Sequence, residues 1–281
     1  MRRLNKRTKA LAAALGGALS VGAGALWLIA PGRVKKEQRA LLRGRYFAHR
    51  GLYDRALGLP ENSLGAFRRA AEHGYGAELD VRMTRDGVLV VSHDANLRRM
   101  TGADCIVEEQ DYEALASLRL DGTDEGVPLF ADALDALYAA GVPVIVEIKP
   151  TSRARRGAVC SAVLSELDRR DGAYCVESFD PFIVRWFRRN APDVLRGQLT
   201  AQRREFDLPA WQTFLLSHGM YNCLGRPQFI AHRVGRKTLG VRLAECLGAM
   251  RVCWTASDYG QERKNDAIIF EHFLPPVRFH D

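Results

Sequence analysis

The sequence lacks any Cys-x-x-Cys pair and any internal repeat, and its only low-complexity tract is an Ala/Gly-rich stretch near the N-terminus. Its six cysteines are scattered along the chain, and Cys175, Cys246 and Cys253 have apolar neighbours. Because zinc modules need closely spaced ligand pairs, this pattern argues against a zinc site. We expect buried free thiols, although an even number of cysteines also permits disulfides in an oxidising compartment.

The greater part of the chain also lacks an excess of basic residues. The formal charge is +8, but residues 1–45 contribute +10 and residues 46–281 sum to −2. A nucleic-acid-binding domain normally has a basic face of its own. We therefore expect no nucleic-acid partner, and we assign the basicity to the N-terminal segment.

Residues 11–30 form a run of twenty residues without a charged side chain. A helix of that length rises about 30 Å, the thickness of a hydrocarbon core. We expect a basic tail at 1–10, a transmembrane or signal-anchor helix at 11–30 and a basic linker at 31–45. Ala23-Gly24-Ala25 resembles a signal-peptidase site, so a cleaved signal peptide stays an alternative.

Both flanks of this run are basic, so the positive-inside rule does not decide its orientation. A short N-terminal tail usually stays in the cytoplasm. On that ground we expect a single-pass protein of the cell membrane whose remaining domain is extracytoplasmic. The sequence leaves the oligomeric state open.

Short apolar runs rich in β-formers alternate with helical patterns over residues 46–281. Strands are expected at 46–49, 77–81, 88–92, 142–148, 174–176, 195–199, 229–232 and 251–255, and 267–270 is either a strand or a turn. Helices are expected at 63–73, 129–140, 158–167, 182–190 and 239–247. This alternation predicts an α/β domain, a (β/α)8 TIM barrel, with residues 95–127 as a small insertion after the third strand.

Polar residues gather where the expected strands end. Glu78 and Asp80 are two residues apart on one strand, so their side chains share a face, and Glu147 and Lys149 repeat that spacing on another. The C-terminal ends of barrel strands form the active-site mouth. We therefore expect these side chains to meet there.

The residue types at these strand ends suit one kind of chemistry. Three carboxylates, Glu78, Asp80 and Glu147, are hard oxygen ligands for one divalent cation, Mg²⁺ or Ca²⁺. Histidines at 49 and 93 suit proton transfer near neutral pH, and the cations Arg50 and Lys149 suit phosphate oxygens. Together they indicate phosphoryl transfer to water.

Several motifs then resemble the glycerophosphodiester phosphodiesterase family in order and spacing. They are His49-Arg50-Gly51, Pro60-Glu61-Asn62-Ser63, Glu78-Leu79-Asp80-Val81, Thr84-Arg85-Asp86-Gly87, Ser92-His93-Asp94, Glu147-Ile148-Lys149, Ser178-Phe179-Asp180 and Trp254-Thr255. The resemblance covers roughly residues 46–270 and is weakest over residues 201–227. It implies a barrel with a small insertion after the third strand.

The resemblance also implies roles for individual residues. His49 and His93 would be the general acid and base, and Glu78, Asp80 and Glu147 would bind the metal. Arg50 and Lys149 would hold phosphate, Glu61 would sit at the mouth and hydrogen-bond a hydroxyl, and Trp254 would line the substrate pocket. Ser63 stands where the family often has threonine, and either residue can cap the following helix.

Three functions remain open at this point. The first is hydrolysis of glycerophosphodiesters to an alcohol and glycerol 3-phosphate, acting on a small-molecule or lipid-derived phosphodiester. The second keeps the chemistry but cleaves a lysophospholipid or poly(glycerol phosphate). The third is a membrane-anchored, non-catalytic binding protein, which the intact histidines and carboxylates disfavour.

Overall fold

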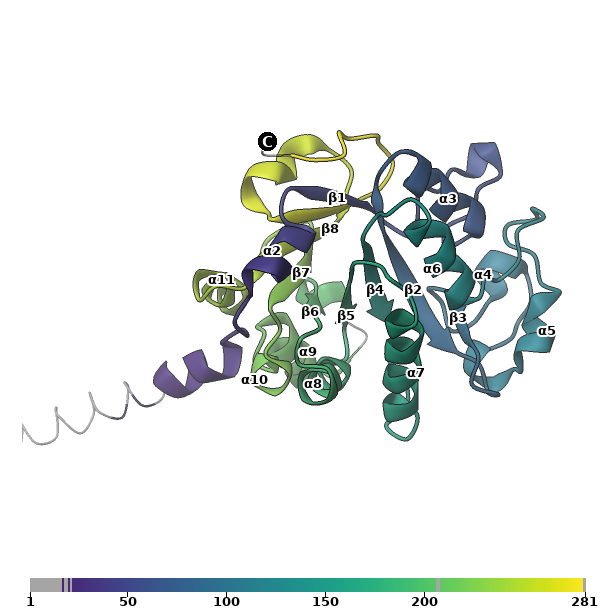
Figure 1. The fold of residues 1–281 in the computed structure, drawn as a ribbon. Helices are drawn as coiled ribbons and strands as arrows, with labels where there is room; N and C mark the ends of the chain where they lie inside the picture. Colours follow the sequence, from purple (N-terminus) through teal and green to yellow (C-terminus); the bar gives the residue numbers. More distant parts are fainter. Residues whose placement is uncertain (1–16, 18–19, 21, 206–207, 280–281) are drawn as a thin grey trace, which may run out of the picture.

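The computed structural model describes residues 17, 20, 22–205 and 208–279. Nine residues of the expected membrane helix, 11–16, 18, 19 and 21, lie outside these residues. Residues 22–29 are helical and project from one side of the molecule (Figure 1). Within the described residues, no helix has the length and apolarity needed to cross a bilayer.

Eight parallel strands close into a barrel, as the alternation of elements predicted. Their order is β1-β9-β8-β7-β6-β5-β4-β2, and pairing of β1 with β2 closes the ring. The barrel strands are β1 (Arg45–Ala48), β2 (Gly76–Met83), β4 (Val144–Ile148), β5 (Tyr174–Ser178), β6 (Arg196–Thr200), β7 (Phe229–Arg233), β8 (Met250–Ala256) and β9 (Ala267–Phe270). The segment 267–270 is thus a strand, and it completes the barrel.

The third expected strand is not part of the barrel. β3 (Leu89–Val91) pairs antiparallel with the far end of β2, with Val81 opposite Val91 and Met83 opposite Leu89. A short turn around Gly87 permits an antiparallel hairpin, whereas a parallel partner would need a longer crossover. β2 and β3 therefore form a ribbon that extends beyond the barrel rim.

The helices surround the barrel, and Figure 1 shows α7 and α8 below it and α3 and α6 to the right. They are α3 (Leu64–Glu72), α6 (Phe130–Tyr138), α7 (Arg156–Asp168), α8 (Pro181–Asn190), α9 (Ala210–Ser217), α10 (Asn222–Gly225) and α11 (Leu239–Cys246), with 3-10 turns η1 (Arg55–Leu57), η3 (Arg203–Glu205) and η4 (Tyr259–Lys264). The Ser63 hydroxyl accepts from the backbone N–H of Ala66 and begins α3, as its position in the sequence predicted.

Residues after β3 form a small unit on the right of Figure 1, with a cluster of apolar side chains of its own. It contains α4 (Arg98–Thr101), α5 (Tyr112–Ala116) and the 3-10 turn η2 (Val107–Glu109). Val90, Leu97, Val107 and Leu115 are fully or almost fully buried there. This unit corresponds in position to the expected insertion at 95–127.

The stretch expected as a linker, 31–45, contains helix α2 (Lys36–Leu42). Leu42 is fully buried against Phe47, Phe229 and Met250, so α2 contributes to the core inside the barrel. The six cysteines are free; Cys175 and Cys253 are buried as expected, but Cys246, at the end of α11, is exposed.

Candidate active site

Three carboxylates converge at the C-terminal end of two neighbouring strands. Asp80 on β2 lies in register with Glu147 on β4, and Glu78 points to the same face. One oxygen from each lies within 4.8 Å of the others, and all three residues are buried. Burial and the negative charges of its neighbours raise the pKa of Glu78 well above its ordinary value. Three ionised carboxylates buried side by side would destabilise the fold unless a cation offset their negative charge.

Two cations lie between these carboxylates. The Lys149 ammonium is 2.7 Å from Asp80 Oδ1 and 2.8 Å from Glu147 Oε1. The Arg50 guanidinium is 2.7 Å from Glu61 Oε1 and 3.5 Å from Asp80 Oδ2. Burial alone would raise the pKa of Asp80, but Lys149 and the other nearby cations outweigh it and lower that pKa. Asp80 is therefore ionised, and the cluster combines anion-binding and cation-binding groups.

The backbone after β1 has an unusual conformation that shapes this cluster. Arg50 and Gly51 both have positive φ, 55° and 80°. A Cβ at residue 51 would lie only 2.9 Å from Ala66, so glycine is required. The tight turn points the Arg50 N–H at Glu78 Oε2, 3.0 Å away. The His-Arg-Gly motif thus fixes one of the three clustered carboxylates through its backbone.

Asn62 also positions a carboxylate, a role that the sequence analysis did not assign. It is buried with a positive φ of 56°, and its side-chain amide donates to Asp80 Oδ2 at 2.7 Å. Its backbone N–H donates to the Arg50 carbonyl. The Pro-Glu-Asn-Ser motif was a signal for this residue, because asparagine tolerates the left-handed conformation better than most residues.

His49 follows β1 and is oriented by Glu271, which follows the last barrel strand, β9. Its Nδ1 lies 2.8 Å from Glu271 Oε2, and its Nε2 lies 3.9 Å from Glu78 Oε2. Since a carboxylate accepts, Nδ1 carries the proton and Nε2 is left facing the carboxylate cluster. The hydrogen bond from His49 lowers the pKa of Glu271.

His93 reaches the same cluster by an unexpected route. The antiparallel β3 returns along β2, and the Ser92 N–H donates to the Asp80 carbonyl, so Ser92 lies opposite Asp80 and His93 comes directly after it. His93 Nδ1 is 2.8 Å from Asp94 Oδ1. Burial lowers the pKa of His93 to about 4, against the opposing effect of Asp80. This environment favours the neutral imidazole.

Glu61 lies at the rim of the mouth, held between two arginines. Its Oε1 accepts from Arg50 at 2.7 Å and from Arg99, on α4, at 2.6 Å. Arg99 also pairs with Asp94, the partner of His93. The insertion thus braces both Glu61 and the second histidine. Whether Glu61 also binds a hydroxyl stays a prediction.

Trp254 lies on β8, across the barrel from β2 and β4. Its indole N–H donates to the Thr200 carbonyl at 3.3 Å, and its ring meets Phe179 edge-on at 6.0 Å. The Arg233 guanidinium lies 5.7 Å from the centre of the Trp254 ring. These contacts place Trp254 among residues of the β5–β8 side, and its substrate-binding role stays a prediction.

The model of the glycerophosphoryl diester phosphodiesterase family matches residues 49–272. The chain belongs to this family. The matched region begins at His49 and includes every residue predicted for the site, as well as Glu271. The resemblance inferred from the motifs is thereby confirmed.

Two curated relatives show how far sequence similarity extends. A lysophospholipase D GDPD1 of Rattus norvegicus is 34% identical over 128 residues, 41% of this chain and 38% of that protein. A glycerophosphodiester phosphodiesterase of Caldanaerobacter subterraneus is 43% identical over 92 residues, 32% of this chain and 36% of that protein. The aligned segments thus span little more than a third of these relatives.

Solved structures share the fold over most of the chain. A glycerophosphoryl diester phosphodiesterase of Silicibacter pomeroyi has a TM-score of 0.67 at 25% identity, covering 83% of this chain and 93% of that one. An Oleispira antarctica phosphodiesterase, solved with sn-glycerol 3-phosphate, has a TM-score of 0.66 at 21% identity, covering 81% and 93%. At this identity the likeness is evidence for the fold.

Glu177, on β5, is a fourth buried carboxyl at the mouth that the sequence analysis missed. It lies in register with Glu147, and its Oε2 has no hydrogen-bond partner within the described part of the chain. Burial and the charge of Glu147 raise its pKa well above the ordinary value. The expected strand at 174–176 stopped one residue short of it, so its alternation with Cys175 went unnoticed.

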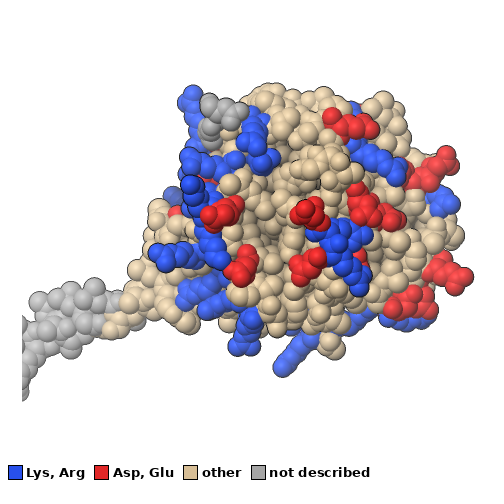
Figure 2. Space-filling view, in the orientation of Figure 1, with Lys and Arg blue, Asp and Glu red and all other residues tan. Residues whose placement is uncertain are grey.

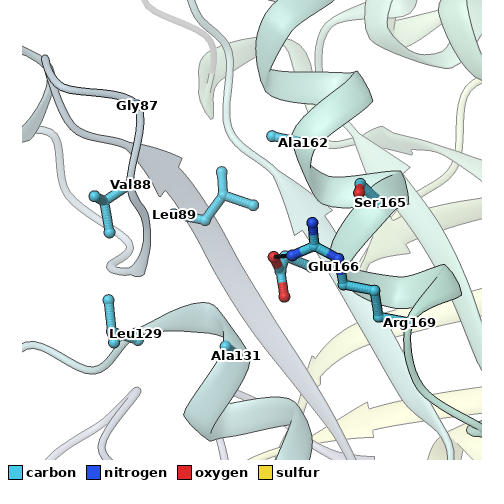
Figure 3. Close-up of a pocket in the computed structure, with 9 residues that line it drawn as sticks. All are labelled: Gly87, Val88, Leu89, Leu129, Ala131, Ala162, Ser165, Glu166 and Arg169. Atoms are coloured by element: carbon cyan, nitrogen blue, oxygen red, sulfur yellow. Dashed lines mark hydrogen bonds and ion pairs between the residues drawn. The ribbon is translucent and has the colours of Figure 1, made fainter.

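A hollow of about 340 Å³ on the flank of the barrel is distinct from this cluster. Figure 3 shows Leu89, Leu129 and Ala162 facing it from the region of β3, α6 and α7, with Glu166 and Arg169 at one wall. Its lining is largely apolar and includes none of the predicted site residues. The carboxylate cluster at the barrel mouth is therefore the candidate active site.

Proposed function

We propose that this protein hydrolyses glycerophosphodiesters to glycerol 3-phosphate and an alcohol, in a reaction that depends on one divalent cation. The observation that carries the proposal is the buried group of Glu78, Asp80 and Glu147, whose oxygens lie within 4.8 Å of one another beside two histidines. Family membership supports it, as does the related Oleispira antarctica phosphodiesterase solved with sn-glycerol 3-phosphate.

The ligand set suits Mg²⁺ or Ca²⁺, because all three side chains offer hard oxygen atoms. Burial and neighbouring carboxylates raise the pKa values of Glu78 and Glu147. A bound cation would offset the repulsion between these carboxylates. When bound, the cation would polarise phosphate oxygens and stabilise the negative charge of the transition state.

Arg50 and Lys149 would hold the phosphate next to the carboxylates. Both cations are mostly buried, so a phosphate entering the mouth would meet charges that water screens little. Their present carboxylate contacts keep them in place, and a guanidinium can hold two phosphate oxygens at once. This arrangement would orient the phosphorus for attack.

Two proton transfers complete the hydrolysis. One histidine would take a proton from the attacking water as its oxygen bonds to phosphorus, and the other would give a proton to the alcohol oxygen as its bond to phosphorus breaks. His49 is oriented by Glu271 and His93 by Asp94, so each is held in one tautomer. We propose this pair as general acid and base without assigning the order.

The direct test is to incubate the purified protein with glycerophosphocholine and Mg²⁺ or Ca²⁺, and to measure both products. We expect equal amounts of glycerol 3-phosphate and choline. Release of phosphocholine and glycerol instead would show cleavage of the other phosphoester bond. The absence of any product with either ion, from a folded protein, would favour the non-catalytic binding alternative.

A second substrate is favoured by an apolar groove beside the mouth. A hollow of about 580 Å³ is lined by Phe179, Phe182, Leu208 and Leu216, and its wall also includes Arg156, Asp180, Glu205 and Pro150, the residue that follows Lys149 in the chain. Phe182 and Leu208 are both more than 40% exposed, so the groove presents apolar surface to a ligand. We propose that the groove can accept the acyl chain of a lysophospholipid.

Paired kinetics would test this second substrate. Phe182→Ser and Leu216→Ser should raise KM for lysophosphatidylcholine several-fold and leave glycerophosphocholine turnover unchanged. Exposed Leu239→Ser, on α11, is a matched control outside the groove. Equal effects on both substrates would mean that the groove does not contact the acyl chain.

We also propose that residues 11–30 anchor the protein in the cell membrane, with the barrel extracytoplasmic. The proposal rests on the uncharged run in the sequence. An inserted helix is held by apolar burial, so the protein should stay with membranes in high salt. Release by salt alone, or a mature N-terminus just after Ala25, would refute the anchor. Digestion of the barrel only after cell lysis would refute the orientation.

A further inference from the structure

A third hollow lies outside the barrel, on the flank formed by the β7–α11 loop, α11 and η4. Its volume is about 590 Å³. We call it the basic pocket, and its lining consists of His232, Arg233, Val234, Gly235, Arg236, Lys237, Arg242, Glu245, Arg251, Cys253, Gln261, Arg263, Lys264 and Asn265. None of these residues belongs to the carboxylate cluster, so the basic pocket is a separate feature.

The lining contains seven cationic side chains and one carboxylate. Three of the cations have carboxylate partners: Arg233 with Glu205, Lys237 with Glu245 and Arg251 with Asp266. The other four form no ion pair with any carboxylate of the described residues: Arg236, Arg242, Arg263 and Lys264. Figure 2 shows Lys and Arg gathering along the left side of the molecule, where α11 lies in Figure 1. The basic pocket therefore has an excess of positive charge, although residues 46–281 as a whole are slightly negative.

A buried polar group in the same wall points independently to a ligand. His232 is 1% exposed, and its Nδ1 hydrogen-bonds the Arg233 carbonyl. Because a carbonyl only accepts, Nδ1 carries the proton, and Nε2 has no partner among the described residues. A buried nitrogen without a partner is costly, so a ligand that supplies one would stabilise the fold.

We propose that the basic pocket binds a phosphate group, as a site separate from the carboxylate cluster. Guanidinium groups bind phosphate oxygens in pairs, and a protonated phosphate oxygen can donate to His232 Nε2. Arg233 lines the basic pocket and also lies over Trp254, on the inner face of the barrel. The basic pocket thus adjoins the mouth on the side opposite β2 and β4.

Two sources of phosphate fit this chemistry. One is free inorganic phosphate, which would act as an independent ligand. The other is the terminal phosphomonoester of an extended substrate such as poly(glycerol phosphate), one of whose diesters lies at the carboxylate cluster; unlike an internal diester, a monoester keeps a proton near neutral pH. This second source rests on the proposed function, whereas the binding of phosphate does not.

Calorimetric titration of the metal-loaded, full-length protein with inorganic phosphate tests the site itself. The test variant is Arg236→Gln/Arg263→Gln/Lys264→Gln, three exposed side chains whose replacement leaves the core untouched. The control is Arg153→Gln/Arg185→Gln/Arg189→Gln, which removes three charges from the surface between α7 and α8. We expect the test variant either to bind one phosphate fewer per chain or to bind phosphate at this site about tenfold more weakly. The control should bind phosphate as the wild type does. Unchanged binding in the test variant, or equal loss in both, would overturn the proposal.

Kinetics then distinguish the two sources. If the pocket holds substrate, the test variant should have a several-fold higher KM for an oligo(glycerol phosphate) that ends in a phosphomonoester, with glycerophosphocholine turnover unchanged. If it holds free phosphate, both substrates should be turned over as by the wild type. The titration measures binding without turnover. If the protein did not hydrolyse glycerophosphodiesters, the titration would therefore still test whether the basic pocket binds phosphate.

Discussion

His49 and His93 differ in which part of the chain holds them. Glu271 comes from the end of the barrel, whereas Asp94 is the residue next to His93 and is fixed by Arg99 of the insertion. Both imidazoles therefore have one nitrogen occupied and the other available to a substrate. At the residue scale the site is two carboxylate–histidine pairs on either side of a carboxylate cluster.

Replacing either histidine should remove most of the activity. His49→Ala and His93→Ala should each lower kcat on glycerophosphocholine by ~10²–10⁴-fold, because each removes one proton-transfer group. The double variant should be little worse than the more damaged single one, since both act in one mechanism. Circular dichroism should show an unchanged fold. A single variant that keeps more than about half of the activity would show that its histidine is structural.

Glu271→Gln should lower activity and change the response to acid. The rate should fall by about 10- to 100-fold, the usual loss when the partner that orients a functional histidine is removed. Because folding lowers the pKa of Glu271, its contribution to stability is present above about pH 4.5 and is lost as the pH falls below that value. Urea unfolding at several pH values should show the variant less stable at pH 7 and equal to the wild type at the acidic end. A constant difference at all pH values would contradict this assignment.

Among the elements, α2 has a larger role than its sequence indicated. It lies in a strongly basic stretch that reads as a linker, yet Leu42 is fully buried and adds to the core within the barrel. A short helix that buries one large side chain gives little periodic signal in a sequence. The fold therefore depends on residues that precede the first barrel strand.

Two truncations would separate the anchor from the fold. Deletion of residues 1–30 should leave a folded, active domain because α2 is retained, although it removes the buried Ile29 and the carbonyl that accepts from Asn222. Deletion of residues 1–44 should destabilise the domain by about 2–5 kcal/mol, the usual cost of removing one large buried aliphatic side chain. The matched variant is Leu42→Ala in the protein that lacks residues 1–30. Chemical denaturation should show a similar loss in its free energy of unfolding. Equal stability of the two truncations would show that α2 does not belong to the fold.

The alternation of strands and helices was enough to predict the barrel, because parallel strands buried on both faces are nearly continuous apolar runs. It could not reveal that β3 is antiparallel, since a short strand reads the same in either direction. The sequence placed His93 at the mouth as though β3 were a barrel strand, whereas the return of β3 along β2 brings it there. Glu177 was missed because the strand expected at 174–176 ended one residue before it. Glu271 was missed because it follows the segment 267–270, which was expected as either a strand or a turn.

On the scale of the whole molecule, the barrel brings together side chains that are far apart in the sequence. His49 and Glu271 are 222 residues apart and hydrogen-bonded. Closure of the barrel by β9 against β1 is what places them in contact. The site therefore depends on the complete ring of strands, and a fragment without β9 would lack the group that orients His49.

The central claim is that the three carboxylates hold a divalent cation on which hydrolysis depends. The measurement is the rate of glycerol 3-phosphate release from glycerophosphocholine after exhaustive chelation, followed by addition of Mg²⁺ or Ca²⁺. We predict that chelation abolishes activity, that at least one of the two ions restores it, and that Glu78→Gln and Glu147→Gln are not restored at concentrations that saturate the wild type. Full activity in the chelated protein would contradict the account.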